Sequence, residues 1–207
     1  MTRFADMTVA QLLAALASSD PTPGGGTAAA VAGAMGTSLL VMVTGLAKSR
    51  TNADEEKAAL ATARAALEPI GAALTRLADT DTEAFNAVMA AFKLPKATDD
   101  EKAARSAAIQ SATRGATLVP LDTLRACVEA LSHGRAVAEH GNRAAASDAG
   151  VAVGLLKAAA DGAAANVRIN LGSLKDAAFV AATEAETSRL SETAASHAAA
   201  ALRSAAN

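Results

Sequence analysis

An uncharged segment from Thr27 to Ala47 constrains the fold of this chain more than any other feature. At about 1.5 Å per helical residue, the segment is long enough to cross a bilayer. It is rich in Gly, Ala, Ser and Thr, however, and it lacks the aromatic belt that flanks many membrane-spanning helices. A helix that is buried on all sides within a bundle must also be apolar all round. We therefore expect a buried central helix, with a membrane span as the alternative.

The dominance of alanine in the rest of the chain predicts an all-α fold. Alanine is the best helix former because it loses no rotamer entropy, and the alternating β-branched residues typical of strands are missing. Small side chains let helices approach closely, so we expect a multi-helix bundle with a core of Ala, Leu and Val. The length of 207 residues fits one domain, residues 1–207. Flat Ala and Gly faces are often shared between subunits, which favours oligomerisation.

Composition also narrows the class of ligand. The chain has 19 basic and 21 acidic residues, so it presents no strongly basic surface for nucleic acid or an anionic membrane. It has four Phe and neither Trp nor Tyr, which removes the stacking platforms of single-strand nucleic-acid binders. The single cysteine, Cys127, and the lack of a leader-like start predict a cytoplasmic protein without disulfides. A small-molecule ligand is the remaining expectation.

Two capping boxes and several breaks set the expected helices. Thr8 with Gln11, and Thr98 with Glu101, have the spacing of capping boxes. Prolines and glycines should kink or end helices at Pro69 with Gly71, and at Pro120. The expected helices span residues 8–19, 27–47, 53–92, 98–119, 121–140, 144–165 and 173–204, and the segment 166–170 suits either a helix or an extended turn.

The glycines Gly24, Gly25 and Gly26 stand directly before the central helix. Unpaired N–H groups at such a helix start can hold a carboxylate or phosphate, and Thr27 could cap the same turn. The motif lacks the Gly-Lys-Ser/Thr ending of a P-loop, so nucleotide binding is not expected. The alternative is that these glycines only allow close backbone packing.

Among the acidic residues, Asp81 and Asp148 are the strongest candidates for chemistry. Asp81 precedes Ala84, Phe85 and Val88 at helical spacing, so its carboxylate lies beside an apolar stripe where burial could raise its pKa and suit it to proton transfer. Asp148 stands among small residues and could accept two hydrogen bonds from a polar heterocycle, or simply cap a helix start. The other acidic candidates, in which surface exposure is the simpler interpretation, are Asp79, Glu83, Asp122, Glu139 and Asp161.

Amides and cations supply further candidates. Asn142, Asn166 and Asn170 are poor helix-interior residues that could read a ligand's amides, or serve in turns and caps. The basic residues nearest to breaks or apolar segments, which could hold a carboxylate tail, are Lys96, Arg105 and Arg168. His133 and His140 have no third ligand nearby in sequence, so we predict no metal site. We interpret Cys127 as a buried small residue.

Eight motifs follow one another along nearly the whole chain: Pro21-Thr-Pro-Gly-Gly-Gly-Thr-Ala-Ala29, Asp81-Thr-Glu-Ala-Phe85, Leu94-Pro-Lys96, Glu101-Lys-Ala-Ala-Arg105, Val119-Pro-Leu121, Gly141-Asn142, Ser147-Asp-Ala-Gly-Val-Ala152 and Asn166-Val-Arg-Ile-Asn170. Together they resemble the cyclodeaminase/cyclohydrolase family, which includes stand-alone methenyltetrahydrofolate cyclohydrolases and the cyclodeaminase domain of formiminotransferase-cyclodeaminase. The resemblance implies a helical, dimer-forming fold and a tetrahydrofolate substrate without a further cofactor.

The resemblance also implies roles for particular residues. Asp81 would transfer protons, and Lys96 would lie near the reacting carbon or the folate carboxylates. The other candidates would bind substrate, and they are Gly24, Gly25, Gly26, Thr27, Arg105, Asn142, Asp148, Asn166 and Asn170. The sequence departs from the family pattern at Ala47-Lys-Ser-Arg-Thr51 and at Arg143.

Three functions are compatible with the sequence. The length of the chain and the lack of an attached transferase favour hydrolysis of 5,10-methenyltetrahydrofolate to 10-formyltetrahydrofolate. The nearest alternative is a formiminotetrahydrofolate cyclodeaminase, which releases ammonia and forms the methenyl compound. A non-catalytic folate-binding or helical assembly protein is the third.

Overall fold

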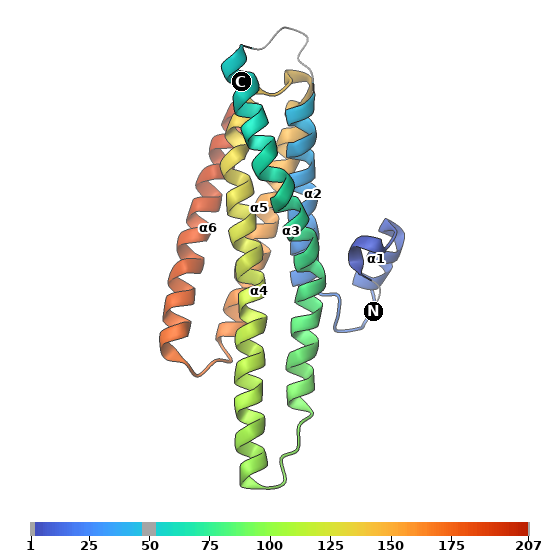
Figure 1. The fold of residues 1–207 in the computed structure, drawn as a ribbon, viewed down its shortest axis with the longest axis vertical. Helices are drawn as coiled ribbons and strands as arrows, with labels where there is room; N and C mark the ends of the chain where they lie inside the picture. The colour runs from blue at the N-terminus through green and yellow to red at the C-terminus, as the bar shows by residue number, and fades with distance from the viewer. Residues whose placement is uncertain (1–2, 47–52, 207) are drawn as a thin grey trace.

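The computed structural model describes residues 3–46 and 53–206. Every regular element in these residues is a helix, so the predicted all-α class is confirmed (Figure 1). The elements are η1 (Phe4–Asp6), α1 (Val9–Leu16), α2 (Gly25–Gly45), α3 (Asp54–Phe92), α4 (Asp99–His140), η2 (Arg143–Ala145), α5 (Ala146–Leu171) and α6 (Ala177–Ala205).

Helices α2, α3, α4 and α5 form the central bundle. Helix α2 packs between α3 and α5, α4 packs against the same two helices from the opposite side, and α6 covers α4 and α5 (Figure 1). The hairpin of α3 and α4 projects beyond the other helices, and α1 lies apart beside α2 and α3. Because α2 begins and α5 ends beside this hairpin, the central bundle has an open end there.

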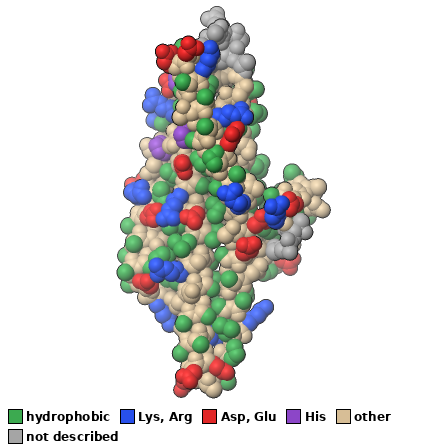
Figure 2. All heavy atoms as spheres, viewed as in Figure 1, with side chains coloured by type: hydrophobic (Ala, Val, Ile, Leu, Met, Phe, Trp, Pro, Cys, Tyr) green, Lys and Arg blue, Asp and Glu red, His purple; other side chains and the backbone are tan. Residues whose placement is uncertain are grey.

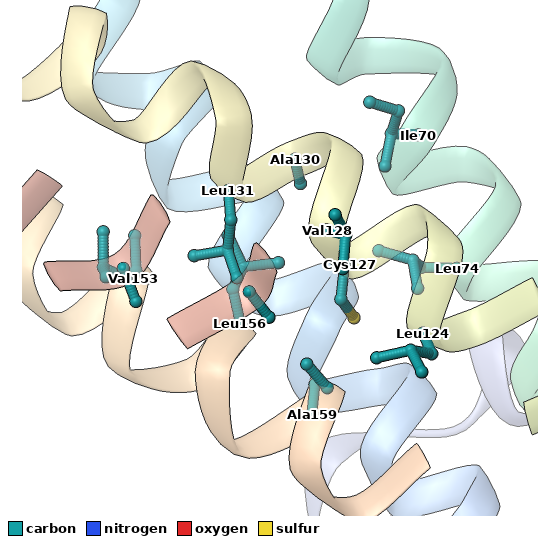
Figure 3. Close-up of a cluster of buried hydrophobic side chains, with 14 of the residues drawn as sticks. Ile70, Leu74, Leu124, Cys127, Val128, Ala130, Leu131, Val153, Leu156 and Ala159 are labelled. Carbon is teal, nitrogen blue, oxygen red and sulfur yellow. The ribbon is translucent and has the colours of Figure 1, made fainter. Parts of the chain in front are cut away.

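Small side chains and leucines fill the core, as the composition predicts. Leu74, Leu124, Leu131 and Leu156 converge from three helices around Cys127 (Figure 3). All five side chains are fully buried. Gly33 lets α2 approach this cluster, since a Cβ atom there would lie 3.0 Å from Cys127 Sγ. Cys127 is therefore the buried small residue that the sequence predicts, and burial raises the pKa of its thiol to about 12.

The central helix α2 is only half covered by its own chain. It is long and apolar enough to span a membrane by length and composition, and half of that window is buried within the protein. The expectation that it is buried on all sides is wrong for the single chain, because Met35 is 55% exposed and Met42 is 41% exposed. The covered half meets α3 and α5. Part of the other half faces the N-terminal segment, where Phe4 and Leu12 pack near Ala30 and Val31.

Both predicted capping boxes are present, but neither proline ends its helix. Thr8 and Gln11 cap α1 reciprocally, as do Thr98 and Glu101 at α4. Helix α3 runs through Pro69 and α4 runs through Pro120 without ending, so the predicted helix end at Pro120 is wrong. Packing on both sides holds these long helices together and outweighs the one lost hydrogen bond. The ambiguous segment 166–170 is helical and ends α5.

Candidate functional site

The open end of the bundle contains a cavity of about 270 Å³ that combines a carboxylate, two amides and an apolar wall. Its residues come from the start of α2, the middle of α3 and α4, and the end of α5. They are Pro21, Thr22, Gly24, Gly26, Asp81, Phe85, Val88, Phe92, Ile109, Thr113, Ala116, Asn166, Asn170 and Ser173. Asp81 is the one charged residue among them.

The Asp81 carboxylate lies against the first turn of α2. A Cβ atom on Gly26 would be 2.5 Å from Asp81 Cγ and 2.6 Å from Oδ2, so only glycine leaves space for the carboxylate here. The glycine segment thus serves close approach, as one sequence interpretation proposed. Helix α2 has no side-chain cap, and the N–H groups of Gly25 and Gly26 have no hydrogen-bond partner in the described parts of the chain. The carboxylate therefore faces the positive end of a helix.

The buried hydroxyl group of Thr27 contacts both the Asp81 carboxylate and the buried hydroxyl group of Thr82. The Thr27 hydroxyl lies 3.2 Å from Asp81 Oδ2, 3.3 Å from the Ala78 carbonyl oxygen and 3.3 Å from the Thr82 hydroxyl. Thr27 is 0% exposed and Thr82 is 1% exposed. Thr27 is not among the residues that line the cavity, and its hydroxyl contacts the carboxylate of Asp81 instead.

Burial raises the pKa of Asp81 above its ordinary value. Hydrogen bonds from the Thr27 hydroxyl and main chain act in the opposite direction, because they favour the charged carboxylate. Burial is the larger of these effects. A carboxyl group with a raised pKa can both accept and donate a proton nearer to neutral pH, which is the property that general acid–base catalysis requires.

The two asparagines at the end of α5 are held by carbonyl groups. Asn166 Nδ2 donates to the Gly162 carbonyl oxygen at 2.9 Å, and Asn170 Nδ2 donates to the Ala116 carbonyl oxygen at 2.9 Å. The Ala116 carbonyl is four residues before Pro120, which has no N–H to offer it. Pro120 thus leaves the Ala116 carbonyl oxygen free to accept from Asn170, and this hydrogen bond fixes Asn170 in the cavity.

The apolar wall comes from the projecting α3–α4 hairpin. Phe85, Val88 and Phe92 lie at helical spacing on α3, and Ile109 and Thr113 face them from α4. A flat aromatic group of a ligand fits such a wall. Helical spacing in the sequence indicates Phe85 and Val88 beside Asp81, but it gives no sign of Phe92 and the α4 residues, because only the packing of the hairpin brings them together.

Lys96 and Arg105 lie beyond this wall, near the tip of the hairpin. Phe92 is about 16 Å along α3 from Asp81, and Lys96 follows it in an exposed loop. Arg105 donates from Nε and Nη2 to the Phe92 carbonyl oxygen at 3.2 and 3.0 Å, and its guanidinium lies 5.5 Å from the Phe92 ring centre. Lys96 is thus distant from Asp81 within one chain, so the geometry does not bring the two predicted catalytic residues together.

Asn142 and Asp148 lie at the opposite end of the bundle. Asn142 Oδ1 accepts from the Ala144 N–H at 2.9 Å and caps η2. Asp148 is in the first turn of α5, about 27 Å along the helix from Asn166. Within one chain neither residue reaches the cavity that contains Asp81.

The remaining acidic candidates have partners elsewhere. Asp79 Oδ1 accepts from the Phe4 N–H at 2.7 Å and anchors the N-terminal segment. Asp122, Glu139 and Asp161 form ion pairs on the surface, and Arg168 pairs with Glu184. Residues 3–46 and 53–206 contain no group of three His, Cys, Asp or Glu side chains that could hold a metal ion. The departure from the family pattern at residues 47–51 lies outside the described residues, because description resumes only at residue 53 after Leu46.

A second cavity, of about 560 Å³, lies between α1, α2 and α3. Its lining includes Phe4, Leu12, Val31, Met35 and Met42, and none of the residues that line it is titratable. Although it is larger, it offers no group for proton transfer, so we assign the chemistry to the cavity beside Asp81.

The structure defines an all-helical bundle whose candidate site combines one carboxyl group of raised pKa, two amides and an apolar wall. The formiminotransferase-cyclodeaminase family profile matches residues 8–189, and the chain belongs to this family. The predicted resemblance is thereby confirmed.

Relatives in this family include both predicted enzymes. The chain is 47% identical over 172 residues to the methenyltetrahydrofolate cyclohydrolase of Methylorubrum extorquens, with 83% of each chain covered. It is 38% identical to the formimidoyltransferase-cyclodeaminase of Sus scrofa over 81% of its own length, but it spans only 31% of that longer protein. The crystal structure of formiminotetrahydrofolate cyclodeaminase from Thermotoga maritima has a TM-score of 0.85 at 26% identity, with 97% of this chain and 96% of that chain covered.

Proposed function

We propose that this protein hydrolyses 5,10-methenyltetrahydrofolate to 10-formyltetrahydrofolate. The observation that carries the proposal is Asp81, a half-buried carboxyl with a raised pKa that faces an amide-lined cavity. The 47% identity to a methenyltetrahydrofolate cyclohydrolase, over most of both chains, supports this particular reaction. The substrate carries a delocalised positive charge on its amidinium group, which a single carboxylate in a half-buried cavity attracts.

The proposed reaction needs one group that moves protons in two steps. A water oxygen bonds to the amidinium carbon while the Asp81 carboxylate takes a proton from that water. The protonated carboxyl then donates to nitrogen 5 of the resulting tetrahedral carbon. The bond between this carbon and nitrogen 5 breaks with its electron pair on nitrogen 5, and the hydroxyl proton leaves as the formyl carbonyl forms on nitrogen 10. One proton is released overall.

The cavity suggests how the substrate lies. The reacting carbon is placed beside Asp81 and the start of α2, and the ring that follows nitrogen 10 lies against Phe85 and Phe92. The substrate carboxylates then point toward the hairpin tip, where Arg105 and Lys96 are the nearest cations. Of the two roles predicted for Lys96, we therefore propose the carboxylate contact and not the contact with the reacting carbon.

Formiminotetrahydrofolate cyclodeaminase is the second candidate function. It is favoured by the structural similarity to the Thermotoga maritima enzyme over nearly the full chain. In that reaction nitrogen 10 attacks the formimino carbon and ammonia leaves, again through a tetrahedral carbon between two nitrogens. The same carboxyl group would serve, so the cavity alone does not separate the two reactions.

An assay of both reactions tests the proposal. The loss of methenyltetrahydrofolate absorbance is measured with purified protein and corrected for spontaneous hydrolysis, and ammonia release is measured from 5-formiminotetrahydrofolate. Hydrolysis without ammonia release supports the proposed function, and ammonia release favours the cyclodeaminase. Silence in both assays leaves the non-catalytic folate-binding protein.

Two variants of α3 make this assay specific. Asp81→Asn should lower the hydrolysis rate by about 10²–10⁴-fold, the usual contribution of a general acid–base group. Glu83→Gln is the matched control, because Glu83 is an exposed carboxylate two residues away that does not line the cavity. Equal rates for the two variants would exclude Asp81 as the proton-transfer residue.

We also propose that the protein acts in the cytoplasm as a homodimer, without a metal, a membrane or nucleic acid as a partner, and that tetrahydrofolate enters only as substrate. The balanced charge, the single buried cysteine and the half-covered face of α2 support these assignments. Gel filtration in detergent-free buffer, with light scattering for mass, tests both the dimer and the lack of a membrane requirement.

A further inference from the structure

A buried threonine on the α4 wall of the cavity has a hydroxyl group without a partner. Thr113 is 6% exposed and lines the cavity together with Ile109 and Ala116, which lie about one helical turn to either side of it. Its hydroxyl makes no hydrogen bond to any group in residues 3–46 and 53–206. The large majority of buried side-chain polar atoms have a partner. Proton transfer by Asp81 does not use this hydroxyl.

The Thr113 hydroxyl opens into the cavity. Other buried threonines, Thr37, Thr117 and Thr187, donate to the carbonyl oxygen four residues earlier, at 2.8, 2.8 and 2.7 Å. In the described parts of the chain, no fully buried side-chain N or O atom lacks a hydrogen-bond partner. Because the Thr113 hydroxyl has no partner, it is one of the few atoms of this residue that remain accessible, and the cavity is where Thr113 is open. Figure 2 shows, by contrast, how many charged side chains cover the outer surface of the bundle.

The register of the α3–α4 hairpin places Thr113 at the level of the apolar wall. Arg105 of α4 donates to the Phe92 carbonyl oxygen of α3, so these two residues are level near the tip. The helices run antiparallel (Figure 1), so the eight residues from Arg105 to Thr113 match the eight from Phe92 back to Ala84. Thr113 is thus about 4.5 Å nearer to the tip than Asp81. Helical side chains tilt toward the N-terminus of their own helix, which separates these two side chains further.

A second hydroxyl group comes from the loop between α5 and α6. Ser173 lines the cavity, and its hydroxyl makes no hydrogen bond within the parts of the chain that the structure describes. Gln110 of α4 clamps this loop, because its Nε2 donates to the Ser173 carbonyl oxygen at 2.9 Å and its Oε1 accepts from the Lys175 N–H at 2.8 Å. Gln110 precedes Thr113 by three residues, so the two are neighbours on the helix surface. The clamp therefore holds Ser173 beside the turn of α4 that carries Thr113.

One polar group of the substrate lies at this level in the proposed orientation. The ring that follows nitrogen 10 lies against Phe85 and Phe92, and an amide joins this ring to the glutamate whose carboxylates point toward the hairpin tip. The amide has a carbonyl oxygen and an N–H group, and both lose water when they enter an apolar cavity. The apolar side chains of the wall cannot replace that water. A hydroxyl group can, because it donates to an oxygen or accepts from an N–H.

We propose that Thr113 and Ser173 bind the amide between the aromatic ring and the glutamate of the substrate. The Thr113 hydroxyl donates to the amide carbonyl oxygen, and the Ser173 hydroxyl accepts from the amide N–H. Gln110 is a positioning residue, since it fixes the loop that carries Ser173. The two hydroxyl groups distinguish substrates with this amide from pterins without it. These roles rest on the proposed function, because the orientation of the substrate does.

Steady-state kinetics of Thr113→Val test this proposal, because valine keeps the shape of threonine and lacks its hydroxyl. We expect KM for 5,10-methenyltetrahydrofolate to rise about tenfold with kcat little changed, as for a hydrogen bond made equally in the ground state and the transition state. For an analogue that ends at the ring, without the amide, KM should be the same as in the wild type. Thr113→Ser keeps the hydroxyl and should restore KM. An unchanged KM for the full substrate, or an equal rise for both substrates, would overturn the proposal.

Thr183→Val is the matched control for this substitution. Thr183 lies in α6 and is 5% exposed, and its hydroxyl, like that of Thr113, has no hydrogen-bond partner among the described residues. Its carbonyl oxygen accepts from the hydroxyl of a threonine four residues later, as the Thr113 carbonyl oxygen does. It does not line the cavity. Thr183→Val should therefore leave KM unchanged, and a rise equal to that in Thr113→Val would mean loosened helix packing and overturn the role of Thr113.

Direct binding separates a failure of this proposal from a failure of the proposed function. Tetrahydrofolate carries the same amide but lacks the carbon that reacts, so its Kd can be measured by calorimetry without turnover. Its Kd should be about tenfold higher for Thr113→Val than for the wild type. Equal Kd values would overturn the amide contact and leave the proposed function in place. Inactivity of the wild-type protein toward 5,10-methenyltetrahydrofolate would instead refute the proposed function, while the comparison of Kd values would still decide whether Thr113 contacts the amide.

Discussion

The carboxyl group of Asp81 packs directly against the Cα atom of Gly26, so the lack of a side chain at position 26 decides where Asp81 can lie. A Cβ atom on Gly26 would lie 2.5 Å from Asp81 Cγ, well inside the normal contact distance. The Asp81 side chain therefore lies where any other residue at position 26 would place its Cβ atom. The third glycine of the motif is explained by this contact rather than by a positive φ angle, since no residue described has one.

We predict that Gly26→Ala lowers kcat/KM by about 100-fold, because displacement of a catalytic group by about 1 Å has effects of this size. The helix itself should tolerate alanine, so the melting temperature is expected to stay within a few degrees. Gly115→Ala serves as the control, since Gly115 lies in α4 with nothing within 4 Å of its Cβ position. Full activity in Gly26→Ala would show that the carboxylate can work from another position.

The raised pKa of Asp81 predicts how Asp81→Asn changes stability with pH. Between the ordinary carboxyl pKa and the raised one, the folded protein binds more protons at this site than the unfolded chain does. The free energy of unfolding of the wild-type protein should thus fall, relative to that of Asp81→Asn, as pH rises through this window. Urea unfolding of both proteins across the window measures the difference. A difference that grows in favour of the wild type would mean that the pKa is lowered.

Thr27→Val should change the pH profile of the reaction. The Thr27 hydroxyl lowers the pKa of Asp81, so its loss should raise that pKa further and move the limb of the kcat/KM profile that requires the carboxylate to higher pH. We expect about a tenfold lower rate at neutral pH, as for the loss of a hydrogen bond to a charged group. Thr27→Ser, which keeps the hydroxyl, should restore the profile. A loss of rate at every pH without a shift would indicate a packing defect alone.

Pro120→Ala should make the protein more stable and weaken its binding of substrate. Alanine supplies the N–H that α4 lacks at this position, and it should take the Ala116 carbonyl from Asn170 Nδ2. We expect the free energy of unfolding to rise by up to about 3 kcal/mol, with a higher KM because Asn170 is no longer fixed. Thermal unfolding and substrate titration provide the two measurements. If KM stays unchanged while stability rises, Asn170 does not contact the substrate.

The sequence by itself determined the helical class and the capped helix starts, and it indicated Asp81 as a carboxyl group beside an apolar stripe, which the structure places in the cavity. These depend on local chemistry: alanine propensity, the spacing of Thr98 with Glu101, and the apolar stripe that follows Asp81. Sequence also identified Asn166 and Asn170 as unusual in a helix, and both line the cavity.

Tertiary structure decided the remaining features, because they depend on contacts between residues far apart in the chain. Pro120 stays within a helix since its neighbours hold α4 in place, and Thr27 faces the core since α3 covers it. Lys96 and Asp148 are set apart from Asp81 by the length of the helices that carry them, a distance that motif order does not encode. Helical geometry fixes what lies within a few turns, whereas packing between helices fixes which ends meet and which face remains open to a second chain.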